Sequence, residues 1–116
     1  MTTFYASTSG RACEVANIAT GKFTSDNTIA NIQCGFSPKF IRVVNTTDVI
    51  IWEWNEGLAA TNTIKVVTAG TTTIDTGTAI SVPVDAGKAT VQGSVSFNIS
   101  AAAAGNAKAI SWIAIA

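Results

Sequence analysis

Carboxylates are the side chains of this sequence best suited to acid–base chemistry, because histidine is absent. Without histidine, no Ser-His or Cys-His nucleophile pair can form within one chain. Glu53 and Glu56 lie in the string WEWNEG, where two acids beside an aromatic ring could hold or cleave a sugar. The same string also fits a solvated hairpin end whose tryptophans belong to the core, and we favour this interpretation. We therefore predict that the protein is not an enzyme.

Ligands for metal ions are equally sparse. The two cysteines, Cys13 and Cys34, cannot complete a tetrahedral zinc site without histidine unless carboxylates join them. Asp75 and Asp85 stand singly at predicted turns, whereas calcium requires several clustered oxygens. We expect no metal and no cofactor. In a reducing cytoplasm the cysteines are most simply small buried residues, although one intrachain disulfide stays open as an alternative.

Charge is scarce on this chain of 116 residues. Only 12% of the residues are charged, and seven basic and seven acidic side chains give a formal net charge of +0. The basic residues are scattered singly and no glycine-rich loop could cradle a phosphate, so we expect no nucleic acid as a partner. No apolar run approaches the length of a membrane span, and we expect no membrane partner. A surface this weakly charged favours association with other proteins.

The distribution of apolar residues predicts strands. Threonine, isoleucine and valine recur throughout, and GFSPKFIRVVN (35–45), a polar turn and IIWEWN (50–55) together predict a hairpin. About eight or nine such short strands, separated by turns too short for crossover helices, predict an all-β, antiparallel β-sandwich, jelly-roll-like in its connections. Residues 1–11 are interpreted as a flexible or partner-docked arm, and residues 12–116 as a single domain. The predicted core contains Phe36, Ile41, Val43, Ile50, Trp52, Val66, Val95, Phe97, Ile99 and Trp112.

One stretch carries a specific resemblance. CGFSPKFIRVVNTTDVIIWEWNEGL (34–58), KVVTAGTTTIDT (65–76), the strand 95–99 and ISWIA (110–114) resemble a pattern of small virion proteins of tailed bacteriophages and prophages. The resemblance covers roughly residues 28–116. It departs from that pattern before the last strand, where an alanine-rich loop replaces acidic residues and a second asparagine, so no ion or partner role is carried over to this loop.

The resemblance implies a small β-sandwich on the surface of the phage capsid. Its implied role is that of a capsid decoration, or cement, protein that clamps neighbouring subunits of the major capsid protein and stabilises the phage head. The first twenty residues lack the basic start and apolar centre of a signal peptide, so we expect synthesis in the host cytoplasm. The alternative is a lectin-like adhesive module of a tail fibre or baseplate, suggested by the tryptophans and glutamates of WEWNEG.

Several strands are apolar on both faces, so a partner is expected to cover one of them. The candidate partner-binding residues lie in the hairpin and in the C-terminal string SWIAIA, which we expect to form an exposed edge strand. They are Trp54, Glu56, Trp112, Ile113 and Ile115. We expect a homo-oligomer. A dimer is the commonest symmetry, whereas the resemblance implies a homotrimer, because capsid lattices present three-fold sites.

Overall fold

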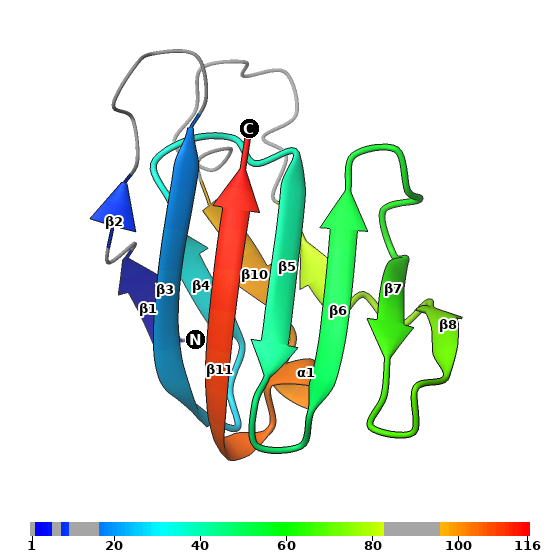
Figure 1. Ribbon diagram of the computed structural model, residues 1–116. Coiled ribbons are helices and arrows are strands. Elements are labelled where there is room, and N and C mark those ends of the chain that lie inside the picture. The colour runs from blue at the N-terminus through cyan, green and yellow to red at the C-terminus, as the bar shows by residue number, and fades with distance from the viewer. Residues whose placement is uncertain (1, 6–7, 10–16, 83–95) are drawn as a thin grey trace.

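The computed structural model describes residues 2–5, 8–9, 17–82 and 96–116, which form two β-sheets in face-to-face layers (Figure 1). The larger sheet has the strand order β2 (Thr8–Ser9), β3 (Ile18–Asp26), β11 (Asn106–Ile115), β5 (Phe40–Asn45), β6 (Ile50–Asn55), β7 (Thr63–Val66) and β8 (Thr72–Asp75). The smaller sheet has the order β1 (Thr2–Tyr5), β4 (Ala30–Gln33), β10 (Ser96–Ile99) and β9 (Ile80–Ser81). The all-β sandwich predicted from the sequence is confirmed, and its jelly-roll connectivity stays a prediction.

The strand pairs are antiparallel except for one. β1 runs parallel to β4, and β2 pairs antiparallel with β3. Two described parts of the segment 1–11, which the sequence suggested as an arm, are therefore strands within the sheets of the same chain. Because β1 pairs with a strand almost thirty residues further along the chain, no local pattern of residues 1–11 could have indicated that pairing.

The predicted hairpin is confirmed as β5 and β6, whose register runs from Phe40 opposite Asn55 to Asn45 opposite Ile50. The Asn45 side chain closes the turn, because its Oδ1 accepts a hydrogen bond of 2.9 Å from the backbone N–H of Asp48. Asparagine is common in turns, where its side chain bonds to nearby backbone groups. The alanine run forms one helical turn, α1 (Ala101–Ala104), capped by the Ser100 hydroxyl. Among the described residues no helix is long and apolar enough to cross a membrane.

The core lies between the two sheets, where the alternating residues of each inner face meet. Seven of the predicted core residues are buried there: Phe36, Ile41, Val43, Trp52, Phe97, Ile99 and Trp112. Ile50 is partly buried and packs against this core, and Val95 lies outside the described residues. The placement of Val66 in the core is wrong. It lies half-buried on the outer face of the larger sheet, because the inward positions of β7 are occupied by Thr63 and Lys65.

The prediction that Cys34 is a small buried residue is confirmed. Its thiol donates a hydrogen bond of 3.2 Å to the backbone carbonyl oxygen of Phe36. Burial raises the pKa of the Cys34 thiol, so the reactive thiolate is disfavoured at neutral pH. Cys13 lies outside the described residues, and so does any pairing between the two cysteines.

Candidate interaction surface

The outer face of the seven-stranded sheet is the surface that turns away from the four-stranded sheet. In β11 the residues Ile110, Trp112 and Ala114 are buried in the core, so the alternating residues Ile113 and Ile115 point outward. Residues directly opposite one another on paired strands share a face, so the strand registers extend this outward set across the sheet. We call the result, from β3 to β8, the outer face.

The outward residues form three rows that cross the strands. The first row, from β3 to β6, contains Ile18, Ile115, Phe40 and Asn55. The middle row, from β3 to β8, contains Thr20, Ile113, Arg42, Glu53, Ile64 and Ile74. The third row, from β3 to β8, contains Lys22, Ser111, Val44, Ile51, Val66 and Thr72.

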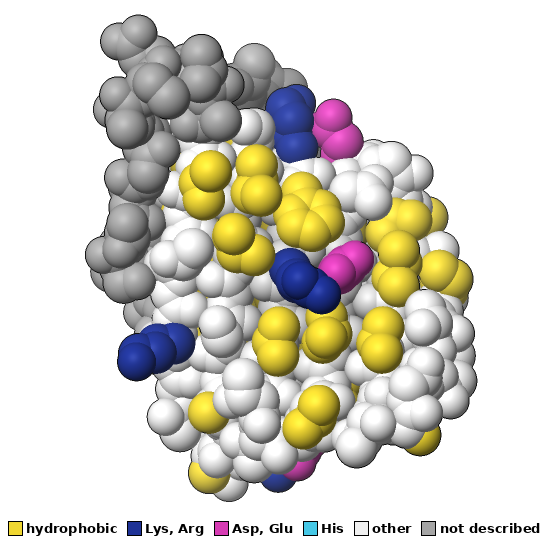
Figure 2. Space-filling view, viewed as in Figure 1, with side chains coloured by type: hydrophobic (Ala, Val, Ile, Leu, Met, Phe, Trp, Pro, Cys, Tyr) yellow, Lys and Arg dark blue, Asp and Glu magenta, His cyan; other side chains and the backbone are white. Residues whose placement is uncertain are grey.

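More than half of the sixteen outward residues in the three rows are apolar. Nine of their side chains are isoleucine, valine or phenylalanine, and each is at least partly exposed, up to 54% for Ile74. Figure 2 shows these hydrophobic side chains spread over the front sheet, with one pair of opposite charges among them. Apolar side chains gathered on one face in this way favour a site of interaction.

The pair of charges in the middle of the outer face is Arg42 and Glu53. The Arg42 Nε lies 3.0 Å from the Glu53 Oε2, and the two residues are direct cross-strand partners on β5 and β6. The other two ion pairs of the described residues lie at the ends of the sheet: Lys39 with Glu56, and Lys108 with Asp48. The centre of the face therefore carries both signs of charge and no net charge.

The predicted partner-binding residues of the C-terminal string lie on opposite sides of β11. Ile113 and Ile115 lie on the outer face, as a partner-binding role would require. Trp112 points into the core, where its ring meets the ring of Phe97 edge to face at a centroid distance of 5.5 Å. The expectation of an exposed edge strand is wrong, because β11 lies between β3 and β5 and pairs with both.

The hairpin does not bring Glu53 and Glu56 together as an acid pair. Glu53 points to the outer face and pairs with Arg42, whereas Glu56 follows the strand and pairs with Lys39 at 3.5 Å. The tryptophans of WEWNEG are core residues, as the structural interpretation predicted. Trp54 and Glu56, the two hairpin residues predicted to bind a partner, both line a hollow of about 340 Å³. The lining residues are Ser37, Pro38, Trp54, Glu56, Leu58, Ala60, Ser81 and Val82.

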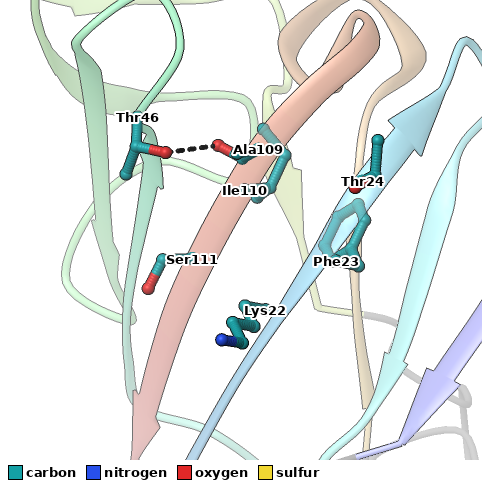
Figure 3. Close-up of a pocket in the computed structure, with 7 residues that line it drawn as sticks. All are labelled: Lys22, Phe23, Thr24, Thr46, Ala109, Ile110 and Ser111. Atoms are coloured by element: carbon teal, nitrogen blue, oxygen red, sulfur yellow. Dashed lines mark hydrogen bonds between the residues drawn. The ribbon is translucent and has the colours of Figure 1, made fainter.

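A second hollow, of about 440 Å³, lies between β3 and β11 at one corner of the outer face (Figure 3). The segment of β11 from Asn106 to Ala109 contains one residue more than the segment of β3 that pairs with it. Within this bulge Ala107 adopts a left-handed φ of 57°. Such a bulge bends its strand locally. The β5–β6 turn holds the bulged segment, because the Thr46 hydroxyl donates a 3.0 Å hydrogen bond to the Ala109 carbonyl oxygen. The lining residues are Lys22, Phe23, Thr24, Thr46, Ala109, Ile110 and Ser111.

Neither hollow gathers groups that could hold a metal ion. Within residues 17–82 and 96–116, no three of the acidic or cysteine side chains come close enough to form such a group. The described residues therefore present an apolar outer face with one hollow at its corner, and a second hollow beside Trp54.

Most residues of the outer face are not among the predicted partner-binding residues. Five of these unpredicted residues are Phe40, Val44, Ile51, Ile64 and Ile74. The sequence pattern that could have indicated them is that both faces of their strands are apolar. Which face would point outward depends on the order of the strands, and the sequence pattern does not contain that order. No protein-family model, curated protein or solved structure matched this chain.

Proposed function

We propose that this chain is a structural virion protein that decorates the phage capsid and cements neighbouring subunits of the major capsid protein. The observation that carries the proposal is the broad outer face, on which nine at least partly exposed isoleucine, valine and phenylalanine side chains gather. The resemblance of residues 28–116 to small phage virion proteins supports the location on a particle. In this proposal the protein works by binding alone and catalyses no reaction.

A cement protein acts by burying surface across the boundary between subunits. Each square ångström of apolar surface that leaves water contributes about 25 cal/mol before the costs of association. A shell held in this way cannot expand or burst without exposing that surface again. The low charge of the chain suits this role, because few charged groups have to lose their water at the contact.

Cryo-electron microscopy of the parent particle tests the proposal. We expect density for this chain on the outside of the head, above the boundaries between major capsid subunits. Particles that lack the chain should release their DNA at a lower temperature, and purified protein added back should restore the original temperature. Density on tail fibres or the baseplate, with none on the head, would overturn the capsid role.

The hollow beside Trp54 favours a second candidate function, the lectin-like module of a tail fibre or baseplate. One aromatic wall, one carboxylate and the hydroxyl groups of Ser37 and Ser81 are groups that bind sugars. A glycan array with wild-type protein and the Glu56→Gln variant tests this candidate, because exposed Glu56 can change without disturbing the core. Glu53→Gln, on the outer face, is the control. Dose-dependent binding that only Glu56→Gln weakens would support the lectin, and an array without binding would exclude it.

A further inference from the structure

We infer that the outer face binds a second copy of this chain, related by a two-fold axis that runs parallel to the strands between β5 and β6. The inference goes beyond the capsid role proposed above, because it names the occupant of this face in the free protein, which a major capsid subunit would displace when it binds the same face on the particle. It is carried by three properties of the described residues: the equal number of strands on either side of the axis, the complementary residues of the middle and third rows with the central pair of charges, and the size of the face.

The first property is that the axis has three strands on either side, with both halves represented in the middle and third rows, whereas the first row ends at β6. Three strands, β3, β11 and β5, lie on one side of it, and three strands, β6, β7 and β8, lie on the other. Rotation about this axis places β5 over the partner's β6, β11 over the partner's β7, and β3 over the partner's β8. The aligned packing of two sheets, which skews the strands by about 30°, is compatible with this arrangement.

The second property is that the middle row becomes complementary to itself under this rotation. Arg42 comes to lie over the partner's Glu53, and the partner's Arg42 over Glu53, so each charge meets its opposite twice. On either side Ile113 lies over the partner's Ile64, so apolar side chains meet apolar side chains. An interface between two identical copies requires this kind of self-complementary surface.

The third row agrees with the same axis. Val44 comes to lie over the partner's Ile51, again an apolar pair. Lys22, the remaining charge among the three rows, lies on β3 at the rim and comes over the partner's Thr72, where its ammonium group can stay in water. No like charges face each other within the three rows.

The third property is the size of the face. The sixteen outward residues of the three rows lie about 4.8 Å apart across the strands and about 6.6 Å apart along them, which gives a flat area of roughly 500 Å². Two copies would bury about 1,000 Å², more once the protruding side chains are included, which is the size of a weak interface just below the roughly 1,200 Å² of stable ones. We therefore expect a dimer with a dissociation constant in the micromolar range.

This arrangement differs from the trimer that the resemblance implies. A three-fold ring needs two different surfaces on each copy that fit each other, whereas a two-fold dimer uses one surface twice. The outer face is one continuous surface, and the edge strand that was expected to meet a neighbour is central in the sheet. The described residues thus favour two copies over three.

Sedimentation equilibrium between about 1 and 500 µM measures the state of the wild type, Arg42→Glu and Glu53→Arg. We expect the wild type to approach twice the monomer mass of 11.9 kDa, and each single variant to dimerise at least tenfold more weakly. Lys39→Glu, which breaks an exposed ion pair at the end of the sheet, is the matched control and should dimerise like the wild type. Circular dichroism confirms that every variant is folded.

Mixing the two single variants gives the sharper result. Arg42→Glu has two acidic residues at the centre of its face and Glu53→Arg has two basic ones, so the mixture should form a heterodimer although neither variant dimerises well alone. The double swap, Arg42→Glu with Glu53→Arg, should also dimerise like the wild type. Loss of an ion pair within one chain would weaken both single variants, but mixing them could not repair it.

Cross-linking tests the axis itself. In a Cys13→Ser background, a short bis-maleimide should join Ile113→Cys to Ile64→Cys in a mixture of the two variants. Ile113→Cys alone should not be joined, because about three strand spacings, roughly 14 Å, separate the two copies of this residue along the face. The inference is overturned by a wild-type monomer at 500 µM, by a mass three times that of the monomer, or by Ile113→Cys cross-linking to itself.

The two-fold interface and the capsid role can be overturned independently of each other. A dimer in solution that never binds a phage head would overturn the capsid role and leave the two-fold interface in place. A protein that stays monomeric in solution at 500 µM but lies above the capsid boundaries on the particle would overturn the interface and leave the capsid role in place.

Discussion

Phe97 is the largest side chain that the described core removes fully from solvent. Its ring packs edge to face on Trp112 and so joins β10 of the small sheet to β11 of the large one. Replacing Phe97 by alanine removes these contacts and leaves a cavity, so we expect the free energy of unfolding to fall by about 3–5 kcal/mol. Urea unfolding followed by circular dichroism measures this loss. Phe97→Leu is the control, with an expected loss below about 1.5 kcal/mol.

The Thr63 hydroxyl destabilises the fold, whereas the Phe97 ring stabilises it. Thr63 is fully buried, and its Oγ1 has no hydrogen-bond partner within the described part of the chain. A buried polar group without a partner costs about 1–3 kcal/mol. We therefore expect Thr63→Val, which keeps the shape of the side chain, to raise the free energy of unfolding by about 1 kcal/mol. The exposed Thr73→Val serves as the control and should change stability little. A lower unfolding midpoint for Thr63→Val would contradict this prediction.

At the scale of the elements, the contact between β3 and β11 depends on a residue without a side chain. Gly21 is the cross-strand partner of Trp112, and a Cβ added at Gly21 would lie 2.6 Å from the indole ring. Atoms this close must move apart, so Gly21→Ala should lower the free energy of unfolding by about 1–3 kcal/mol. Thermal unfolding of Gly21→Ala, Trp112→Phe and the double variant tests this, because a smaller ring should relieve part of the clash. Additive losses in the double variant would show that the two residues do not touch.

Local elements of this fold could be predicted from the sequence. The β5–β6 hairpin followed from two alternating runs and a polar turn, because a short connection brings its own strands together. The sandwich followed from the density of β-branched residues. The face of β7 did not follow, because Ile64 and Val66 are equally apolar whether they meet the core or a partner. The prediction of an exposed edge strand was wrong for a related reason, since the position of β11 depends on its pairing with β3, which lies far away in the chain.

At the scale of the whole molecule, the apolar surplus of the sequence predicted an interaction surface but not its location. Apolar residues on both faces of a strand indicate that something covers each face. Among the predicted residues, Ile113 and Ile115 are on the outer face, whereas Trp112 and Trp54 are buried in the core. The self-complementary rows became visible only with the registers, because they combine six strands that span most of the chain.

The order of the strands makes the C-terminus essential for folding. Chain ends are often dispensable because they lie outside the main contacts, but β11 lies in the middle of the large sheet. Removing residues 111–116 would delete half of the strand that joins β3 to β5, with most of its pairs to β5 and with the buried Trp112 and Ala114. It would leave unpaired backbone groups and exposed apolar residues on both neighbouring strands. We therefore expect the shortened chain to be unfolded or aggregated at 25 °C.

An extended chain provides the control for this truncation, because a flexible Gly-Ser tail attached after Ala116 adds residues without removing a strand pair. The tail should leave the unfolding midpoint within about 2 °C of the original value, since a change under 0.5 kcal/mol at the surface moves the midpoint by only a few degrees. Far-ultraviolet circular dichroism and a one-dimensional proton spectrum distinguish the two chains. A cooperatively folded protein without residues 111–116 would mean that β3 and β5 hold together without β11, and would overturn the strand order on which the outer face depends.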